Sequence, residues 1–301
     1  MDDIHELIEY QSKIDWSSTR IADTQFKQLV RSILKNGHLD KNPRPKYADG
    51  TPAHTISINH VVQTFNLSKG HLPLLSLRPI SYKSAIGEIL WIWQDQTTDL
   101  DVLKDKYNIK WWDDWEVDNT RSIGQCYGAT VKRYDMMNRL LEGIEKDPDS
   151  RRHILDLWQF NDFNEPHGLK PCALYSQYNV VHTDDGDYLD GFLLLRSSDY
   201  LTAGAINQIQ YAVLLCLIAR HTGYKVRQFT NFIVNCQCYD RHVENAKIML
   251  ERDTIDANPT IWLNPDKKNF YDFTIDDIKI NDYPVDEIKK INPQLKFDLG
   301  I

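Results

Sequence analysis

The longest apolar stretch of the chain, residues 203–219, limits the folds that this sequence can adopt. It is interrupted by three polar side chains, those of Asn207, Gln208 and Gln210. A segment of this length that carries polar residues is typical of a helix buried in a soluble protein and not of a membrane span. We therefore expect a buried helix over 205–221 that ends near Gly223.

Helical and strand-like patterns are mixed along the rest of the chain. Apolar residues at helical spacing predict further helices over 21–35, 81–94, 127–144 and 241–252. Short or alternating apolar runs predict strands over 55–64, 153–159, 173–182, 188–195 and 228–236. Because strict βαβ alternation is absent, we expect an α+β fold with helices packed over a large mixed sheet. No linker or repeat divides the chain, which predicts a single domain over 1–301.

The composition narrows the class of protein and of partner. A net charge of −8 argues against nucleic acid as the main partner, although it permits a local basic pocket for a phosphate. Five cysteines, an odd number, favour a reducing compartment over a disulfide framework. Residues 1–16 are acidic where a signal peptide is basic, and no apolar segment follows them. We expect a soluble cytoplasmic protein.

Cys172 is the first candidate for chemistry. It follows Pro171 and stands directly before a predicted strand, a position in which a thiol can be partly exposed. Nearby arginines would favour its reactive thiolate form. The alternative is a small buried hydrophobic residue, the common state of a lone cysteine in a chain of this size.

Two groups of arginines are candidates for an anion site. The tetrad 196–199, Arg-Ser-Ser-Asp, follows an apolar strand, and its arginine and serine can hold a phosphate by charge and by hydroxyl. Arg151 and Arg152 open another predicted strand. The alternatives are a surface salt bridge with a turn cap for the tetrad and a solvated pair for the two neighbouring arginines.

Glu88 and a group of tryptophans complete the candidates. Glu88 lies among apolar helix residues, where it either has a raised pKa suited to proton transfer or occupies an exposed stripe. The tryptophans can stack on a flat ring or belong to the core; they are Trp111, Trp112 and Trp115. Cys236 and Cys238 are too closely spaced for a zinc site, and we expect no metal.

Taken in order, these motifs resemble the thymidylate synthase family from about Ile21 to the C-terminus. The branch with the loop 49–55, Asp-Gly-Thr-Pro-Ala-His-Thr, is the most similar. The other matching landmarks are Glu88-Ile-Leu-Trp-Ile-Trp, Trp112-Asp-Asp-Trp115, Tyr127-Gly128, Arg151-Arg152-His153, Pro171-Cys172, Arg196-Ser197-x-Asp199, Asn207, Tyr239-x-x-His242 and Asn269-Phe-Tyr-Asp-Phe.

The resemblance implies a homodimer that forms through the sheet and shares arginines between its two sites. Arg44, Arg196 and Ser197 of one chain would hold the phosphate of dUMP. Arg151 and Arg152 would reach into that site from the partner chain. It implies no membrane and no need of nucleic acid for catalysis, and a host cytoplasm if the chain is phage-encoded.

The resemblance also implies a one-carbon transfer from 5,10-methylenetetrahydrofolate to C5 of dUMP. Cys172 would add to C6 of the pyrimidine, which turns C5 into a carbon nucleophile. Glu88 would relay protons, and Tyr127 would lie beside the water that helps to remove the C5 proton. Hydride transfer from the folate would then give dTMP and dihydrofolate.

The same resemblance assigns residues to the two ligands. Asn207 would read the uracil edge, since an amide both donates to O4 and accepts from N3–H. Tyr239 would bind the deoxyribose 3′-hydroxyl. The folate would contact Asp199, Trp112 and Trp115.

Several positions near the ligands depart from the family pattern. Gln237 replaces the usual histidine two residues before the sugar-binding tyrosine; it can still hydrogen-bond a hydroxyl but cannot titrate. Residues 203–207 read Ala-Gly-Ala-Ile-Asn where Gly-x-Pro-Phe-Asn is usual. Trp111 stands at a normally aliphatic position beside the folate, and Ala173 replaces a common histidine.

These departures leave three interpretations open. The chain is an ordinary thymidylate synthase whose pocket has drifted, or a dUMP 5-hydroxymethylase of phage type in which water captures the exocyclic methylene. The third is a non-catalytic nucleotide-binding module, against which the retained Cys172, Glu88, Tyr127 and Asn207 argue.

Overall fold

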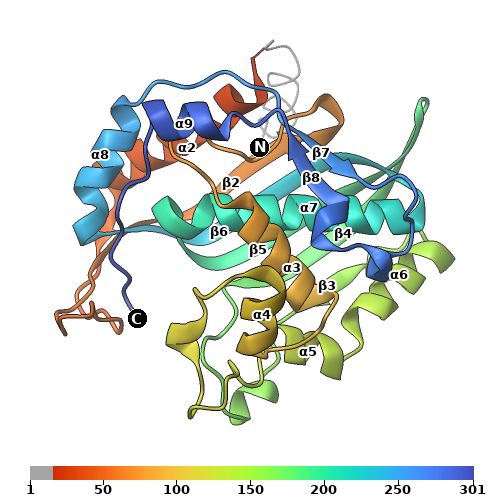
Figure 1. Cartoon of the computed structure of the whole chain (residues 1–301), viewed down its shortest axis with the longest axis horizontal. Coiled ribbons are helices and arrows are strands. Elements are labelled where there is room, and N and C mark those ends of the chain that lie inside the picture. Colours follow the sequence, from red (N-terminus) through yellow and green to blue (C-terminus); the bar gives the residue numbers. More distant parts are fainter. Residues whose placement is uncertain (1–15) are drawn as a thin grey trace.

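A mixed six-stranded sheet underlies the computed structural model, which describes residues 16–301 (Figure 1). The opening residues 1–15, on which most of the signal-peptide argument depends, lie outside the described part. The strand order is β1-β2-β6-β5-β4-β3, and every neighbouring pair is antiparallel except β5 with β6. The bounds are β1 His38–Leu39, β2 Thr55–Asn66, β3 Ile154–Asp156, β4 Ala173–Thr183, β5 Gly186–Asp199 and β6 Lys225–Tyr239.

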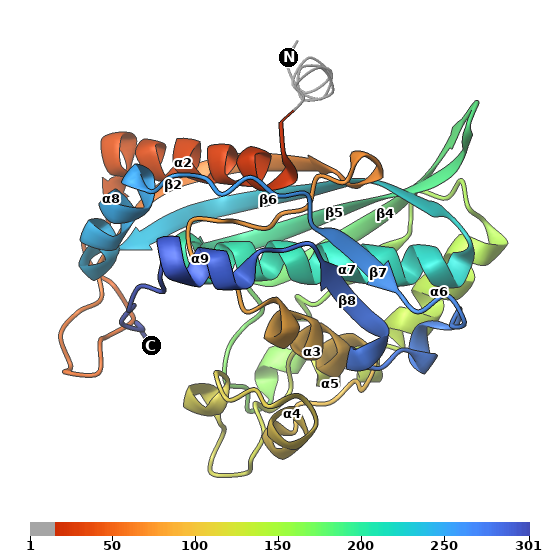
Figure 2. The ribbon, with the colours of Figure 1, turned by 45° about the horizontal axis from the view of Figure 1, so that its top comes forward.

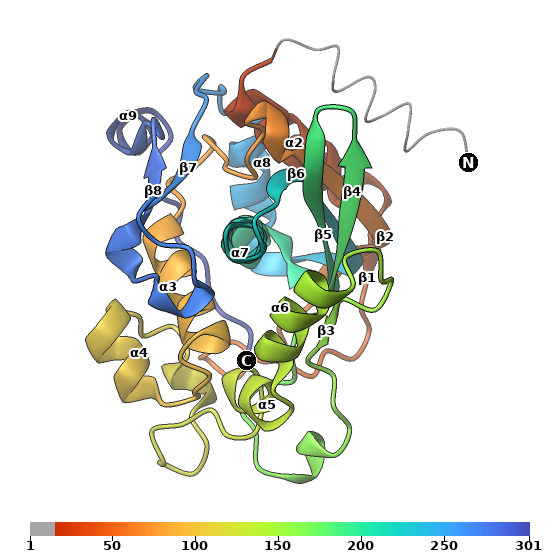
Figure 3. The ribbon, with the colours of Figure 1, turned by 90° about the vertical axis from the view of Figure 1, so that its right-hand side faces the viewer.

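The predicted buried helix is α7, Ala205–Thr222, and it lies between the sheet and α3, Tyr82–Trp93 (Figures 2 and 3). With the preceding turn of π-helix, Tyr200–Gly204, it is long and apolar enough to cross a membrane by length and composition alone. However, 72% of its most apolar window is buried inside the protein. Helix α7 is therefore the core helix that the polar interruptions indicated, and Gly223 ends it in a left-handed conformation.

The remaining helices complete the layer around α7. They are α2 Ser18–Asn36, α4 Leu100–Tyr107, α5 Gly128–Arg133, α6 Met136–Lys146, α8 Val243–Glu251 and α9 Val285–Ile291. A separate hairpin consists of β7, Thr260–Leu263, and β8, Ile278–Asn281. In α2 the side chain of Ser17 caps the first turn, and Phe26 stacks on Tyr200 at 5.2 Å between ring centroids. The α+β architecture with a large mixed sheet confirms the predicted fold class.

Several predicted elements have different bounds in the structure. The helix predicted over 127–144 is two helices, α5 and α6, because Asp135 adopts a left-handed conformation with φ of 50°. The strand predicted over 153–159 is only the three residues of β3. Strand β5 continues to Asp199, so the Arg-Ser-Ser-Asp tetrad belongs to the strand instead of following it.

The face of the sheet opposite the helices carries a row of half-exposed apolar side chains. Figure 3 shows α7, α3 and α4 on one side of the sheet. On the other face the cross-strand neighbours Val62, Phe232, Leu194 and Tyr175 follow one another from β2 to β4. Val62 is 44% exposed. An apolar face of this kind is typical of an interaction surface.

Asp162 fixes the loop that leads to Cys172, and its removal should destabilise the fold. Its buried carboxylate accepts hydrogen bonds from Thr130 Oγ1 at 2.5 Å, Gln125 Nε2 at 3.0 Å, Arg133 Nη1 at 2.8 Å and Tyr134 Oη at 3.1 Å. Burial opposes ionisation, yet these donors lower the pKa of Asp162 below its usual value.

We expect Asp162→Ala to lower the free energy of unfolding by about 2–4 kcal/mol, since it leaves buried donors without their acceptor. Urea unfolding followed by fluorescence measures this change. The loss should be largest near neutral pH and should shrink as the pH falls through the folded-state pKa of Asp162, because protonation removes the same interaction in the wild type. An equal loss at all pH values would contradict the assignment.

Candidate active site

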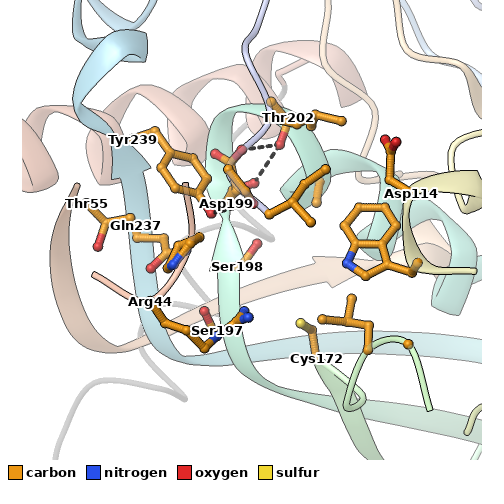
Figure 4. A pocket seen from close by; sticks show the side chains of 18 of the residues that line it. Arg44, Thr55, Asp114, Cys172, Ser197, Ser198, Asp199, Thr202, Gln237 and Tyr239 are labelled. Atoms are coloured by element: carbon orange, nitrogen blue, oxygen red, sulfur yellow. Dashed lines mark hydrogen bonds between the residues drawn. The ribbon is translucent and has the colours of Figure 1, made fainter. Parts of the chain in front are cut away.

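A cleft of about 810 Å³ opens where β5 and β6 end near the loop of residues 40–45 (Figure 4). A smaller, mostly apolar chamber of about 270 Å³ adjoins it. Cys172 and Asn207 line both spaces and therefore mark their junction. Most of the predicted site residues line one or both: Arg44, Glu88, Trp112, Trp115, Tyr127, Cys172, Arg196, Ser197, Asp199, Asn207, Gln237 and Tyr239.

Cys172 lies directly before β4, at the wall of the cleft, and is half-buried. Of the five cysteines, all of which belong to the described part, it alone lines the cleft. Its backbone N–H donates to Tyr127 Oη at 3.1 Å. Arg196 Nη2 lies 3.4 Å from its Sγ. Burial raises the pKa of the Cys172 thiol, while Arg196 and Arg44 oppose this effect by favouring the thiolate.

Arg196 is held in place by the turn that carries the cysteine. Its Nε donates to the carbonyl of Pro171 at 2.9 Å, and Nη2 donates to the carbonyl of Lys170 at 2.8 Å. Since β5 continues through the tetrad, the guanidinium projects from a paired strand and not from a mobile turn. Arg44, Ser197 and Cys172 lie along one side of the cleft in Figure 4. Two arginines and a hydroxyl at this position can bind a phosphate.

The structure does not bring Arg151 and Arg152 into this cleft. Both side chains are exposed and precede β3 at the edge of the sheet. Neither lines the cleft or the chamber. Within one chain they are therefore separate from Arg44, Arg196 and Ser197, which line the cleft.

Glu88 is buried at the end of the apolar chamber, so the alternative of an exposed helix stripe is wrong. Trp111 Nε1 donates a hydrogen bond to its Oε2. Burial raises the pKa of Glu88 to about 7, which suits a group that both accepts and releases protons at neutral pH. Tyr127 is also buried and adopts a positive φ of 43°. For a bulky residue this conformation is strained, a feature common at functional sites.

The chamber has the features needed to hold a flat heterocycle. Trp112 packs against Trp115 and Tyr127, with ring centroids at 5.5 and 5.1 Å. At the mouth, Asp199 accepts a hydrogen bond from Thr202 through Oδ2. Its Oδ1 is buried without a hydrogen-bond partner. Among residues 16–301 no group of three or more His, Cys, Asp or Glu side chains could hold a metal ion.

Some lining residues were missed by the sequence analysis. Gln210 accepts a hydrogen bond from Asn207 Nδ2 at 3.1 Å and lines the chamber. A polar residue three positions after Asn207 in an apolar helix was the signal for it. Three C-terminal residues also line the cleft, and Ile301 exchanges backbone hydrogen bonds of 2.8 and 3.0 Å with Lys46. No local pattern indicated this contact across the whole chain.

The chain is similar to known proteins along almost all of its length. The family model for thymidylate synthase matches residues 24–295. The thymidylate synthase of Streptococcus gordonii is 46% identical over 281 residues, 93% of this chain and 99% of the relative. A thymidylate synthase of Streptococcus pneumoniae has the same identity and coverage. The solved structure of thermostable thymidylate synthase A from Bacillus subtilis matches with a TM-score of 0.83 at 33% identity, covering 93% of this chain and 99% of that one. This chain therefore belongs to the thymidylate synthase family.

Proposed function

We propose that the protein methylates dUMP to dTMP, with 5,10-methylenetetrahydrofolate as the donor of both the carbon and the hydride. The observation that carries this proposal is the position of Cys172, at the junction of a cleft with arginines and an apolar chamber with a buried carboxylate. One space accommodates a nucleotide and the other a flat ring. A nucleophile between them can activate the first ligand for attack on the second.

The nucleotide would enter with its phosphate toward Arg44, Arg196 and Ser197. Cys172 Sγ would form a bond to C6 of the uracil, which moves the ring electrons onto O4 and C5. The guanidinium of Arg196, already 3.4 Å from the sulfur, favours the thiolate that this step requires. Asn207 would hydrogen-bond the uracil edge and so select uracil over cytosine.

The later steps need proton transfers at the ring, which the chamber can provide. Glu88, with a pKa raised to about 7 by burial, would relay protons to the ring and to the folate. Tyr127 Oη would orient the water that takes the proton from C5. C5 would first bond to the methylene carbon of the folate, and loss of the C5 proton would then break the bond between that carbon and the folate nitrogen, leaving an exocyclic methylene on the ring. Hydride transfer from the freed tetrahydrofolate to this methylene would give the methyl group and dihydrofolate as Cys172 departs from C6. Gln237 and Tyr239, both of which line the cleft, would bind the sugar.

The folate would occupy the apolar chamber and its mouth. Trp112 and Trp115 would pack against it, and the carboxylate of Asp199, which lines the adjoining cleft, would accept from the pterin. The described residues form one continuous core from Ala22 to Ile288, which supports a single catalytic domain. All five cysteines are free, and this supports a cytoplasmic location.

We also propose a homodimer in which each site takes two arginines from the partner chain. The half-exposed apolar row from Val62 to Tyr175 supports pairing of two sheets through their open faces. Arg151 and Arg152 stand at the edge of the sheet and outside their own cleft, a position from which they could serve a neighbouring one.

Product analysis tests the proposed reaction. The protein is incubated with dUMP and methylenetetrahydrofolate, the nucleotide is analysed by mass, and dihydrofolate is followed by absorbance. We expect a methylated nucleotide and dihydrofolate in equal amounts, with none formed when dUMP is omitted. A hydroxymethyl nucleotide together with tetrahydrofolate would contradict methylation and would make Gln237 and residues 203–206 the first to revert. No product, with dUMP bound, would favour the non-catalytic module.

A further inference from the structure

Trp111 makes the hydrogen bond that holds the buried carboxylate of the chamber. Glu88, in the middle of α3, is only 7% exposed. Trp111 follows α4 and is half-buried against the same chamber. Its Nε1 donates to Glu88 Oε2 across 23 residues of sequence. The aliphatic residue that the family resemblance gives as usual at this position would have no donor to offer.

A glycine in α3, Gly87, lets the segment that carries Trp111 pack closely against this helix. A Cβ atom at Gly87 would lie 2.9 Å from Cβ of Tyr107 and 3.1 Å from Cδ1 of Ile109. The first distance is too short for a real contact and the second is tighter than most, and the obstructing atoms belong to a packed segment. Asn108 ends α4 in a left-handed conformation and turns the chain toward Trp111. The adjacent Gly87 and Glu88 therefore act together, one by leaving room and the other by accepting.

The other donors near Glu88 do not replace this contact. Gln210 and Trp112 also face the carboxylate and, like Trp111, lower the pKa of Glu88 against the effect of burial. Only Trp111 has the distance and angle of a hydrogen bond to it, since Nε2 of Gln210 and Nε1 of Trp112 are buried without such a partner. The titratable groups that share the chamber are the hydroxyls of Tyr127 and Tyr211 and the Cys172 thiol. Burial raises the pKa of each above its usual value, and for Cys172 the charges of Arg196 and Arg44 oppose this effect.

We infer that Trp111 is a positioning residue for the reaction: its indole N–H fixes the Glu88 carboxylate in one orientation toward the chamber. This inference rests on the proposed role of Glu88 as a proton relay. A relay works only when the carboxylate points at the proton it moves, and a buried carboxylate depends on its best-aligned donor for its orientation.

The variant Trp111→Phe removes the N–H and keeps an apolar ring. We expect kcat to fall about tenfold, with little change in KM for dUMP, since the lost hydrogen bond is to the relay and not to the nucleotide. The limb of the kcat–pH profile that belongs to Glu88 should move to higher pH, because a donor to a carboxylate lowers its pKa. Trp115→Phe, in the same loop but without a bond to Glu88, should leave that limb in place.

A double-mutant cycle separates this inference from the proposed function. In a Glu88→Gln background, Trp111→Phe should cause no further loss of kcat, since there is no longer a relay to position. If Glu88→Gln keeps full turnover, the relay role fails and the inference fails with it. The inference alone is wrong if Glu88→Gln loses turnover but two results differ from expectation: Trp111→Phe leaves the Glu88 limb of the pH profile unmoved, and it lowers kcat by the same factor in the Glu88→Gln background as in the wild type. Trp111→Leu, which also lacks a donor, repeats the test should the phenylalanine variant fold poorly.

Discussion

Turnover should be abolished when Cys172 is replaced by serine, with kcat reduced by about a thousandfold or more, while dUMP binding is kept. A serine hydroxyl does not ionise at neutral pH as a thiol can. The structure places Arg196 beside this position, and Arg196 cannot act as a general base that would activate a hydroxyl. The phosphate and base contacts use other side chains, so nucleotide affinity should change little. Steady-state kinetics and calorimetric titration with dUMP measure the two quantities.

The matched control is Cys216→Ser. Cys216 lies on α7 outside the cleft and the chamber, so its replacement should leave kcat within about twofold. Mass analysis of the wild-type protein trapped with dUMP and folate should show the covalent adduct, and the Cys172→Ser protein should show none. Full turnover of Cys172→Ser would contradict covalent catalysis. Loss of both turnover and binding would instead indicate that the turn before β4 had collapsed.

Features that depend on local spacing could be predicted from the sequence. Helix α7 was expected over 205–221 and spans Ala205–Thr222, because its apolar residues and the glycine that ends it are close in sequence. Cys172 was expected before a strand and lies directly before β4. The ends of the sheet strands are harder to predict from the sequence. Strand β5 continues through polar residues to Asp199 because β6 pairs with it there.

Features that depend on distant neighbours could not be decided from the sequence. Whether Glu88 was buried or exposed depended on Trp111 and Gln210, which come from two other elements. The sheet supplies only part of the cleft, whose lining runs from Asp40 to Ile301. Helices α4 and α9, with 8 and 7 residues, were missed because such short elements show too few apolar repeats and gain their stability from packing.

Removing the two exposed arginines should disable the enzyme even though neither lines its own cleft. We expect Arg151→Ala/Arg152→Ala to raise KM for dUMP about a hundredfold, since two charge-assisted contacts to the phosphate are lost. Arg31→Ala/Arg139→Ala, which removes two exposed arginines on α2 and α6, should have no such effect and controls for the change in net charge.

A mixture of two inactive proteins should regain activity if the sites are shared. The Cys172→Ser protein keeps both arginines, and the double arginine variant keeps its cysteine. The two proteins are denatured together at equal concentration and refolded, so that half of the dimers contain one chain of each kind. In each such dimer, one of the two sites combines the intact cysteine of one chain with the intact arginines of the other. We therefore expect about a quarter of the wild-type activity, with the wild-type KM for dUMP.

The recovered KM decides between shared and separate sites. If Arg151 and Arg152 acted only within their own chain, mixing would leave each cysteine beside the same damaged phosphate site, and no activity with the wild-type KM would return. Recovery also requires exchange of chains, so proteins mixed without denaturation should regain activity only as fast as dimers dissociate. A substitution that introduces a charge on the open face, Val62→Glu, should weaken that dimer and make the recovered activity depend on protein concentration.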